Sequence, residues 1–468
     1  MSDTLKMSVK YLIQQCKDMG IKGYSGKNKS ELLELIKLKE MPSVTASVSV
    51  SASVSNNVSV SVSASIPNNV SIPISASIPM SASLKFIDLF CGIGGFHQAM
   101  KQFGGECVFA CDIDKHCREI YETNYGLKPH SDITTAVVED IPDFDVICAG
   151  FPCQSFSNSG KKKGLSDKRG NLFEYILKIA VVKRPRFMFL ENVKHIKKID
   201  NGDVFTHILK RINESGYNVS VFELSPHQLG VPQQRERVIF VCVRNDLPTQ
   251  TLTIDPPKTK IDLSLFLEKT VDAKYKVSPE IENILEVWDE MIIKIDVGDS
   301  LSPTILCNEF NTIYTPSEFK ALPKWKQDYI NKNKPIYNKY KEHWDKWYEI
   351  NHELLQSKEV FGKLEWQVGP KKKNDSIFNY FIQIRQSGIR VKKTNYFPTL
   401  VAIVQTPIYA KERRYITPRE CARLQSFPDD FIIHKNDHTA YKQFGNAVNV
   451  KVVHYVINET FKLYSGCV

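Results

Sequence analysis

A cysteine in a loop that contains glycine and proline is the first candidate for chemistry in this sequence. Cys153 follows Pro152 and Gly150, and the preceding residues 145–149 have the length and β-branching of a buried strand. Proline fixes its own φ and glycine permits angles that other residues avoid, so this turn would present the thiol to a cleft. The alternative is an inert, buried cysteine, because intracellular cysteines usually pack as small apolar residues.

A carboxylic acid at a second strand end favours the reactive interpretation. Residues 186–190 are predicted to form a buried strand, which delivers Glu191 and Asn192 at its carboxyl end. Ligands and chemistry lie at the carboxyl ends of strands in α/β sheets. Glu191 beside Cys153 would form a pair of proton donor and nucleophile.

Two arginines precede a further predicted strand. Arg235 and Arg237 lie just before residues 238–241, which are apolar and β-branched. Cations near a cysteine lower the pKa of its thiol and so favour the thiolate. The alternative is that both arginines form surface ion pairs with acidic neighbours such as Glu236.

A glycine turn predicts a cofactor site near the start of the same sheet. Residues 85–90 read as a buried strand, 91–95 as a tight turn and 96–103 as a helix. Asp112 lies 20 residues after Gly92, where a carboxylate can accept both hydroxyls of a ribose.

The spacing of the glycines narrows the class of cofactor. The turn reads Gly-x-Gly-Gly rather than Gly-x-Gly-x-x-Gly, which disfavours a pyrophosphate and with it a nicotinamide dehydrogenase. A cofactor with a ribose and a base but no phosphates fits better, and S-adenosylmethionine is one.

Composition limits the remaining classes. The chain has 468 residues and a net charge of +10, which suggests a polyanionic partner. Its eleven cysteines show no C-x-x-C pair, and no apolar run resembles a signal peptide or a membrane span. We therefore expect an intracellular protein, in the nucleoid and cytoplasm or in the nucleus depending on the host. No metal is expected: zinc at Cys107, Cys111, His116 and Cys117 is disfavoured because Cys107 falls in a predicted strand.

The first 83 residues differ from the rest. Residues 1–40 predict two short helices around a glycine-broken basic loop at 22–29, and this unit resembles a SAP-type DNA-binding module. A helical hairpin that docks to protein is the alternative. Residues 41–83 are a low-complexity linker rich in serine, valine and alanine.

The motifs beyond residue 84 resemble, in order, those of the DNA cytosine-5 methyltransferases, most closely the bacterial restriction–modification type. The motifs are Phe86–Gly95, Gly150–Gln154, Glu191–Val193, Gln233–Arg237, Arg419–Gln425 and Gln443–Val448. The resemblance covers 84–245 and 408–468. It implies an α/β fold: a Rossmann-like methyltransferase sheet with a smaller inserted target-recognition domain, after the small N-terminal helical module. The expected parts are a catalytic domain at 84–250 and 408–468, interrupted by a target-recognition region at 251–407.

The resemblance assigns roles by position. Cys153 would be the nucleophile, Glu191 the proton donor to the cytosine ring, and Arg235 and Arg237 would bracket the flipped base, with Asn192 in the same catalytic set. The S-adenosylmethionine pocket would comprise Phe90, Gly92, Ile93, Gly94, Gly95, Asp112, Ile113, Asp132, Ile133, Gly150, Pro152, Leu172, Asn446 and Ala447. The DNA contacts would include Gln154, Ser159, Lys161 and Lys162 as well as both arginines. The alternative for the lysines at 161–162 is a solvated surface loop without a role in DNA binding.

The recognition region contains all five tryptophans, mixed with lysines and tyrosines. Such a mixture suits phosphate contact and base stacking, and a helical insertion that merely packs is an equal alternative. Arg385, Gln386 and Arg390 are the candidates for base contacts, because arginine and glutamine pair bidentately with guanine and adenine.

The sequence thus predicts a monomer that methylates double-stranded DNA, with a cognate restriction endonuclease as a candidate partner. One alternative is RNA methylation, although the related transfer-RNA enzymes tend to lack the Gln-x-Arg-x-Arg element and a large recognition region. Another is a non-catalytic DNA-binding protein, which the intact Cys153 and Glu191 disfavour.

Overall fold

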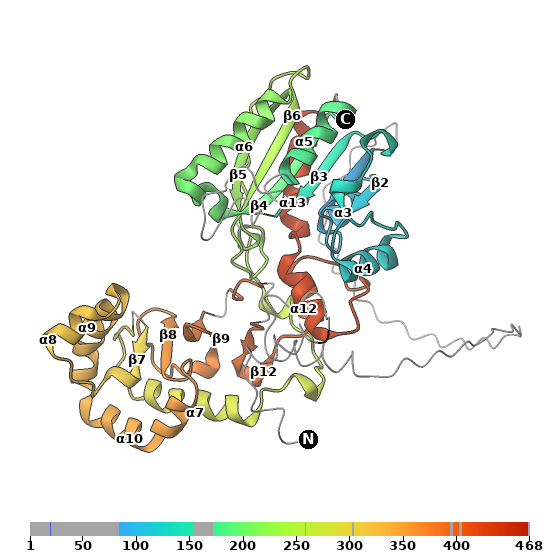
Figure 1. Ribbon diagram of the computed structural model, residues 1–468. Helices are drawn as coiled ribbons and strands as arrows, with labels where there is room; N and C mark the ends of the chain where they lie inside the picture. Colours follow the sequence, from blue (N-terminus) through green and yellow to red (C-terminus); the bar gives the residue numbers. More distant parts are fainter. Residues whose placement is uncertain are drawn as a thin grey trace, which may run out of the picture. The chain divides into compact units, whose positions relative to one another are not determined.

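The first sheet has six strands in the order β2-β1-β3-β4-β6-β5 (Figure 1). The computed structural model describes residues 19, 84–152, 172–257, 259–301, 304–393, 396–401 and 405–466. The strands are β1 (Lys85–Leu89), β2 (Glu106–Cys111), β3 (Val146–Gly150), β4 (Phe187–Val193), β5 (Tyr217–Leu224) and β6 (Arg237–Arg244). Strands β1 to β4 are parallel, and β6 runs antiparallel to both β4 and β5.

Helices cover both faces of this sheet, because alternate residues of its strands are apolar on each side. The helices are α3 (Gly95–Lys101), α4 (Lys115–Tyr125), α5 (Leu172–Lys183), α6 (Asp203–Glu214), α11 (Pro418–Leu424), α12 (Asp437–Asn446) and α13 (Val450–Leu463). Phe187 and Phe189 of β4 pack in the cluster that includes α3 and α13. Met188 and Leu190 pack in the cluster that includes α5 and α6. None of the described helices is both long and apolar enough to cross a membrane.

The elements predicted around the site are confirmed. The predicted strands at 85–90, 145–149, 186–190 and 238–241 correspond to β1, β3, β4 and β6, and the strand predicted to contain Cys107 is β2. The direction of β6 was not predicted. A strand buried on both faces has the same apolar composition whichever way it runs, so only its pairing reveals the direction.

The second sheet has the order β12-β11-β9-β10-β8-β7 and belongs to the predicted recognition region. Its strands are β7 (Ile305–Leu306), β8 (Lys363–Gln367), β9 (Phe381–Arg385), β10 (Gly388–Lys392), β11 (Ile408–Tyr409) and β12 (Arg414–Tyr415). The helices of this region are α7 (Pro279–Ile293), α8 (Pro316–Ala321), α9 (Lys324–Lys339) and α10 (Lys341–Ser357). The second sheet therefore extends to Tyr415, past the boundary expected at 407.

Most of the tryptophans in this region pack rather than face solvent. Trp288 and Trp344 are fully buried, and Trp347 and Trp366 nearly so, whereas Trp325 is 53% exposed. The indole N–H of Trp288 donates to the Phe361 carbonyl at 2.8 Å. For these four tryptophans the packing alternative is correct, and base stacking is left only to Trp325.

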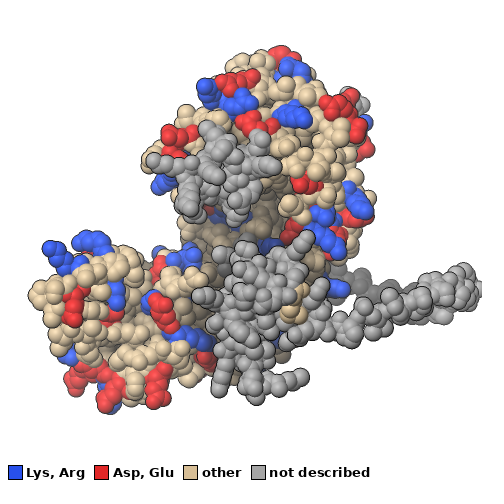
Figure 2. Space-filling view, in the orientation of Figure 1, with Lys and Arg blue, Asp and Glu red and all other residues tan. Residues whose placement is uncertain are grey.

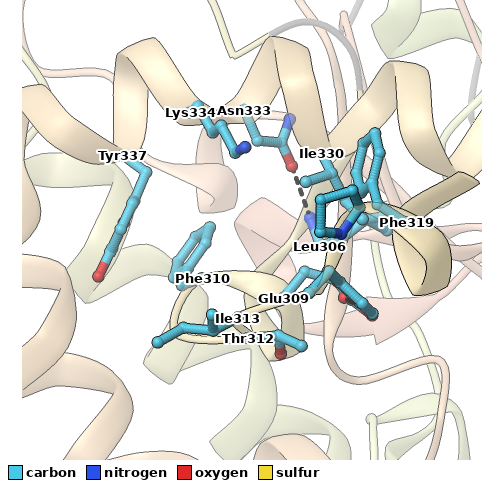
Figure 3. A pocket seen from close by; sticks show the side chains of 12 residues that line it. Leu306, Glu309, Phe310, Thr312, Ile313, Phe319, Ile330, Asn333, Lys334 and Tyr337 are labelled. Atoms are coloured by element: carbon cyan, nitrogen blue, oxygen red, sulfur yellow. Dashed lines mark hydrogen bonds between the residues drawn. The ribbon is translucent and has the colours of Figure 1, made fainter.

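A cavity of about 450 Å³ lies between residues 306–319 and α9 (Figure 3). Phe310, Phe319 and Ile330 form apolar walls. Asn333 closes one side, where its Oδ1 accepts the Leu306 backbone N–H at 3.0 Å. The cavity contains none of the predicted site residues.

A very close backbone contact joins the beginning and the end of the predicted catalytic part. A Cβ added to Gly95, the first residue of α3, would lie 2.4 Å from the Val448 carbonyl oxygen. Only glycine permits this distance between the start of α3 and the residues before α13.

We predict that Gly95→Ala lowers the free energy of unfolding by about 1–3 kcal/mol, because either the helix or the C-terminal segment must shift. Chemical denaturation measures the change. Gly466→Ala is the matched control, since a Cβ there meets nothing within 4 Å. Equal stability of the two variants would contradict the close approach.

Candidate active site

Two neighbouring strand ends bring the predicted acid and one arginine together. In the sheet Gly150, at the end of β3, pairs with Glu191 of β4. Arg237 begins β6 opposite Val193, and its Nε lies 2.9 Å from Glu191 Oε1. Both side chains are largely buried, at 16% and 11% exposed. Arg237 is therefore paired with Glu191 rather than with the surface acid Glu236.

Asn192 holds the turn that leads toward the predicted nucleophile. Its Nδ2 donates to the Phe151 carbonyl at 2.9 Å, and its Oδ1 accepts the Val193 N–H at 2.9 Å. The side chain is only 3% exposed. These contacts make Asn192 a positioning residue.

Five predicted residues lie outside the described part of the chain: Cys153, Gln154, Ser159, Lys161 and Lys162.

The buried side chain of Arg235 joins its own segment to two others by hydrogen bonds. Its Nη1 donates to the Leu400 carbonyl at 2.8 Å, and its Nη2 donates to the carbonyls of Gly445 and Ala447 at 3.0 Å each. The side chain is 3% exposed, and burial lowers the pKa of the Arg235 guanidinium. With Glu191 and Arg237 it also lines a small hollow. The surface ion pair considered for Arg235 is wrong, and its contact with a flipped base stays a prediction.

The glycine turn has the backbone expected for close approach to a ligand. Phe90, Gly92 and Gly94 all have left-handed φ values, of 54°, 53° and 86°. Such a value is unusual for phenylalanine and marks a constrained backbone. Asp112 supports the turn, because its Oδ2 accepts the Gly92 N–H at 2.7 Å.

The Asp112 carboxylate can still accept hydrogen bonds from a ligand. Its Oδ1 accepts the Asp114 N–H at 2.8 Å, and a carboxylate has lone pairs beyond the two used here. Burial raises the pKa of the Asp112 carboxyl, while both backbone hydrogen bonds act in the opposite direction.

Further predicted cofactor residues lie on four other segments of the chain. Asp132 caps a short 3₁₀ helix (Ile133–Thr135) by accepting the Thr134 N–H at 2.9 Å. Ile113 is 80% exposed and Ile133 is buried. Leu172 begins α5, and Asn446 ends α12 with Ala447 directly after it. An ion pair of 3.0 Å between Lys442 and Asp114 ties α12 to the loop that carries Asp112.

A buried polar cluster of Asp88, His97 and Tyr121 lies next to the glycine turn and was not predicted from the sequence. Asp88 of β1 is 1% exposed, and the Tyr121 hydroxyl lies 3.5 Å from its Oδ2 and 2.7 Å from His97 Nδ1. Burial raises the pKa of Asp88 and lowers that of His97 to about 4, so a neutral cluster is favoured. The only signal was an aspartate within the apolar run 86–90.

The candidates for base contacts lie on one hairpin. Arg385 ends β9, Gln386 lies in the exposed turn, and Arg390 lies in β10. Arg390 pairs with Glu365 of β8, with Nε to Oε2 at 2.7 Å. Its role in reading bases stays a prediction, and in this structure its guanidinium is oriented by Glu365.

Charge is mixed on the surface. On the face in Figure 2, basic and acidic side chains of the described residues alternate without one broad basic area. The net charge of +10 therefore does not by itself locate a DNA surface on this face.

The fold and the site together define an α/β protein with a buried glutamate–arginine pair at β4 and a glycine turn after β1, with β3 between the two strands. Residues 84–462 match the family described as C-5 cytosine-specific DNA methylase. The chain belongs to this family, and the prediction of a DNA cytosine-5 methyltransferase is confirmed.

Relatives match over most of the chain. Type II methyltransferase M.HhaI of Haemophilus parahaemolyticus is 32% identical over 80% of this chain and 93% of its own length. Type II methyltransferase M.BanI of Aneurinibacillus aneurinilyticus is 34% identical over 81% and 96%. The solved structure of S. pombe Dnmt2 methyltransferase has a TM-score of 0.49 and 20% identity, covering 81% of this chain and 99% of that one.

We predict that Arg235→Lys lowers the free energy of unfolding by about 3 kcal/mol, because a lysine ammonium cannot reach carbonyls on separate segments at once. Denaturant titration measures the loss. Arg237→Lys is the control, since it keeps a cation beside Glu191 and should change stability by about 1 kcal/mol or less. Native stability of Arg235→Lys, with a loss confined to base binding, would assign Arg235 to the base instead.

Proposed function

We propose that this enzyme transfers a methyl group from S-adenosylmethionine to C5 of a cytosine flipped out of duplex DNA, through a covalent bond between Cys153 and C6. The Glu191–Arg237 pair is the main support for this proposal. Glu191 pairs in the sheet with Gly150, and Gly150 is three residues before Cys153 in the sequence. The family and the intact Gly-Phe-Pro-Cys sequence support it.

The chemistry needs a nucleophile and a proton donor together, because cytosine C5 is a weak nucleophile. The Cys153 thiolate adds to C6, and the electrons of the 5,6 double bond become available at C5 while Glu191 delivers a proton toward N3. After methylation, removal of the C5 proton re-forms the double bond and expels the thiolate. Base flipping costs about a few kcal/mol, which contacts along the DNA must offset.

The residues around the glycine turn fit S-adenosylmethionine, which would supply the electrophilic methyl group. A Cβ added to Gly92 would meet nothing within 4 Å, so the backbone there is open to a ligand, whereas Gly94 packs against Tyr125. Asp112 can accept ribose hydroxyls. Exposed Ile113 offers an apolar surface for an adenine ring. The proposed pocket further includes Phe90, Ile93, Gly95, Asp132, Ile133, Gly150, Pro152, Leu172, Asn446 and Ala447.

Biological context is proposed from the relatives. Both curated relatives are named Type II methyltransferases, which supports a role beside a cognate restriction endonuclease inside the cell. We propose that a monomer is sufficient for catalysis. Residues 1–40, of which only Met19 is among the described residues, are proposed as a SAP-like module that adds affinity for long DNA.

We predict that Asp112→Asn weakens S-adenosylmethionine binding by about tenfold or more, because an uncharged amide accepts hydrogen bonds less strongly. Calorimetry measures the affinity. Asp143→Asn serves as the control, because the Asp143 side chain is 97% exposed. Bisulfite sequencing should show the same methylated site in both variants. An unchanged affinity would remove Asp112 from the pocket.

We predict a denaturant-stable adduct with duplex DNA that carries 5-fluorocytosine, formed only with S-adenosylmethionine. Fluorine at C5 cannot leave as a proton does, so the bond between Cys153 and C6 persists. Bisulfite sequencing of a plasmid from expressing cells first identifies the target site. A denaturing gel and mass spectrometry of the linked peptide then detect the adduct.

Three variants make this test specific. Cys153→Ser should abolish the adduct, and Glu191→Gln should slow its formation, because an amide cannot deliver the proton. Cys148→Ser is the matched control, since Cys148 is fully buried in β3. Retention of the adduct in Cys153→Ser would reject the covalent mechanism at this residue.

A further inference from the structure

Two histidines and a glutamate converge away from the catalytic pair. His116 and Glu119 lie three residues apart at the start of α4, and His434 lies between α11 and α12. One ligand atom from each side chain can be chosen so that all lie within 4.8 Å of one another. The imidazole rings of the histidines are 5.2 Å apart between centroids, and His116 Nδ1 is 3.1 Å from Glu119 Oε2.

The donor set suits a particular class of ion. Imidazole nitrogen and carboxylate oxygen together favour zinc and similar divalent transition metals over magnesium, which prefers oxygen ligands. Three protein ligands leave a fourth position for water. The side chains of His116 and Glu119 are about half exposed, so an ion can reach them and they can rotate inward.

His434 is oriented by its own loop. Its Nδ1 lies 3.3 Å from the Asn436 carbonyl and 3.0 Å from the Asn436 N–H. In the structure the Asn436 N–H donates to Nδ1. Metal binding requires the other tautomer, in which Nδ1 carries the proton, the Asn436 carbonyl accepts it in place of that N–H contact, and Nε2 is free to bind a metal. Ligating histidines in proteins are commonly held by such a contact to a carbonyl.

The two segments that carry the ligands are already fastened together. Asn124 of α4 accepts the Ile432 N–H at 2.8 Å and donates to the Ile432 carbonyl at 3.0 Å. The Lys442–Asp114 ion pair joins the same segments on the other side. The ligands are therefore held near one another without the ion, which reduces the entropy lost on binding.

We propose that His116, Glu119 and His434 form a binding site for a zinc-class divalent ion, which links α4 to the segment before α12. Each linked segment also carries a residue proposed for the cofactor pocket: Asp112 precedes α4 and Asn446 ends α12. The ion would thus fasten two sides of that pocket together without taking part in catalysis.

The test uses the untagged full chain, freed of metal with a chelator. Calorimetry with zinc chloride should show one site that is absent with magnesium chloride, and zinc should raise the thermal unfolding midpoint. His116→Ala and His434→Ala should abolish this site, and Glu119→Gln should weaken it by about tenfold or more. His438→Ala and Glu122→Gln, which change exposed neighbours on α12 and α4, should bind as the wild type does.

Cobalt distinguishes this site from binding at a thiol, because cobalt bound to sulfur gives a near-ultraviolet charge-transfer band. We expect cobalt to bind without that band. Wild-type zinc affinity in His434→Ala, or a sulfur band that accounts for all bound cobalt, would overturn the proposal. Retained DNA methylation by the metal-free variants shows that they are folded.

Discussion

The hydrogen bonds of the buried Arg235 guanidinium are the constraint on which the arrangement of the site depends. A cation inside a protein needs hydrogen-bond acceptors, because without them its charge is left uncompensated. Here the acceptors are carbonyls of Leu400 and of the Gly445–Ala447 segment. The end of the recognition region and the C-terminal segment must therefore both be in place before Arg235 can be buried. Arg237, two residues later, then reaches Glu191.

The same C-terminal segment completes the cofactor side of the sheet. Val448 approaches Gly95 so closely that no side chain fits between them, and α13 packs with α3 on one face of the sheet. Asn446 precedes this contact directly, so its position relative to the glycine turn follows from the packing of α13. Two distant pieces of sequence are thus joined by the buried Arg235 cation, by the Gly95–Val448 contact and by the packing of α13 with α3.

In the second sheet the alternation of side chains along each strand separates an apolar packing face from a polar face. Leu364, Trp366, Ile389 and Val391 face the core that α7 and α10 cover. Residues between them, such as Glu365 and Arg390, lie on the opposite face and pair with each other. Polar side chains on that face can therefore vary without disturbing the core.

The sequence by itself determined the elements and the chemistry. Apolar runs at 85–90, 145–149 and 186–190 predicted buried strands, which are present, and Cys153, Glu191 and the glycine turn follow them at fixed offsets. These features are local, so residue types and spacing suffice to predict them. Tertiary structure decided which groups pair over long separations: Arg237 with Glu191, Arg235 with three carbonyls, Arg390 with Glu365, and His116 and Glu119 with His434. It also decided that four of the five tryptophans are core residues. An arginine or a tryptophan has the same local pattern whether it meets a base, a carboxylate or the core, and only the packing of distant segments selects its partner.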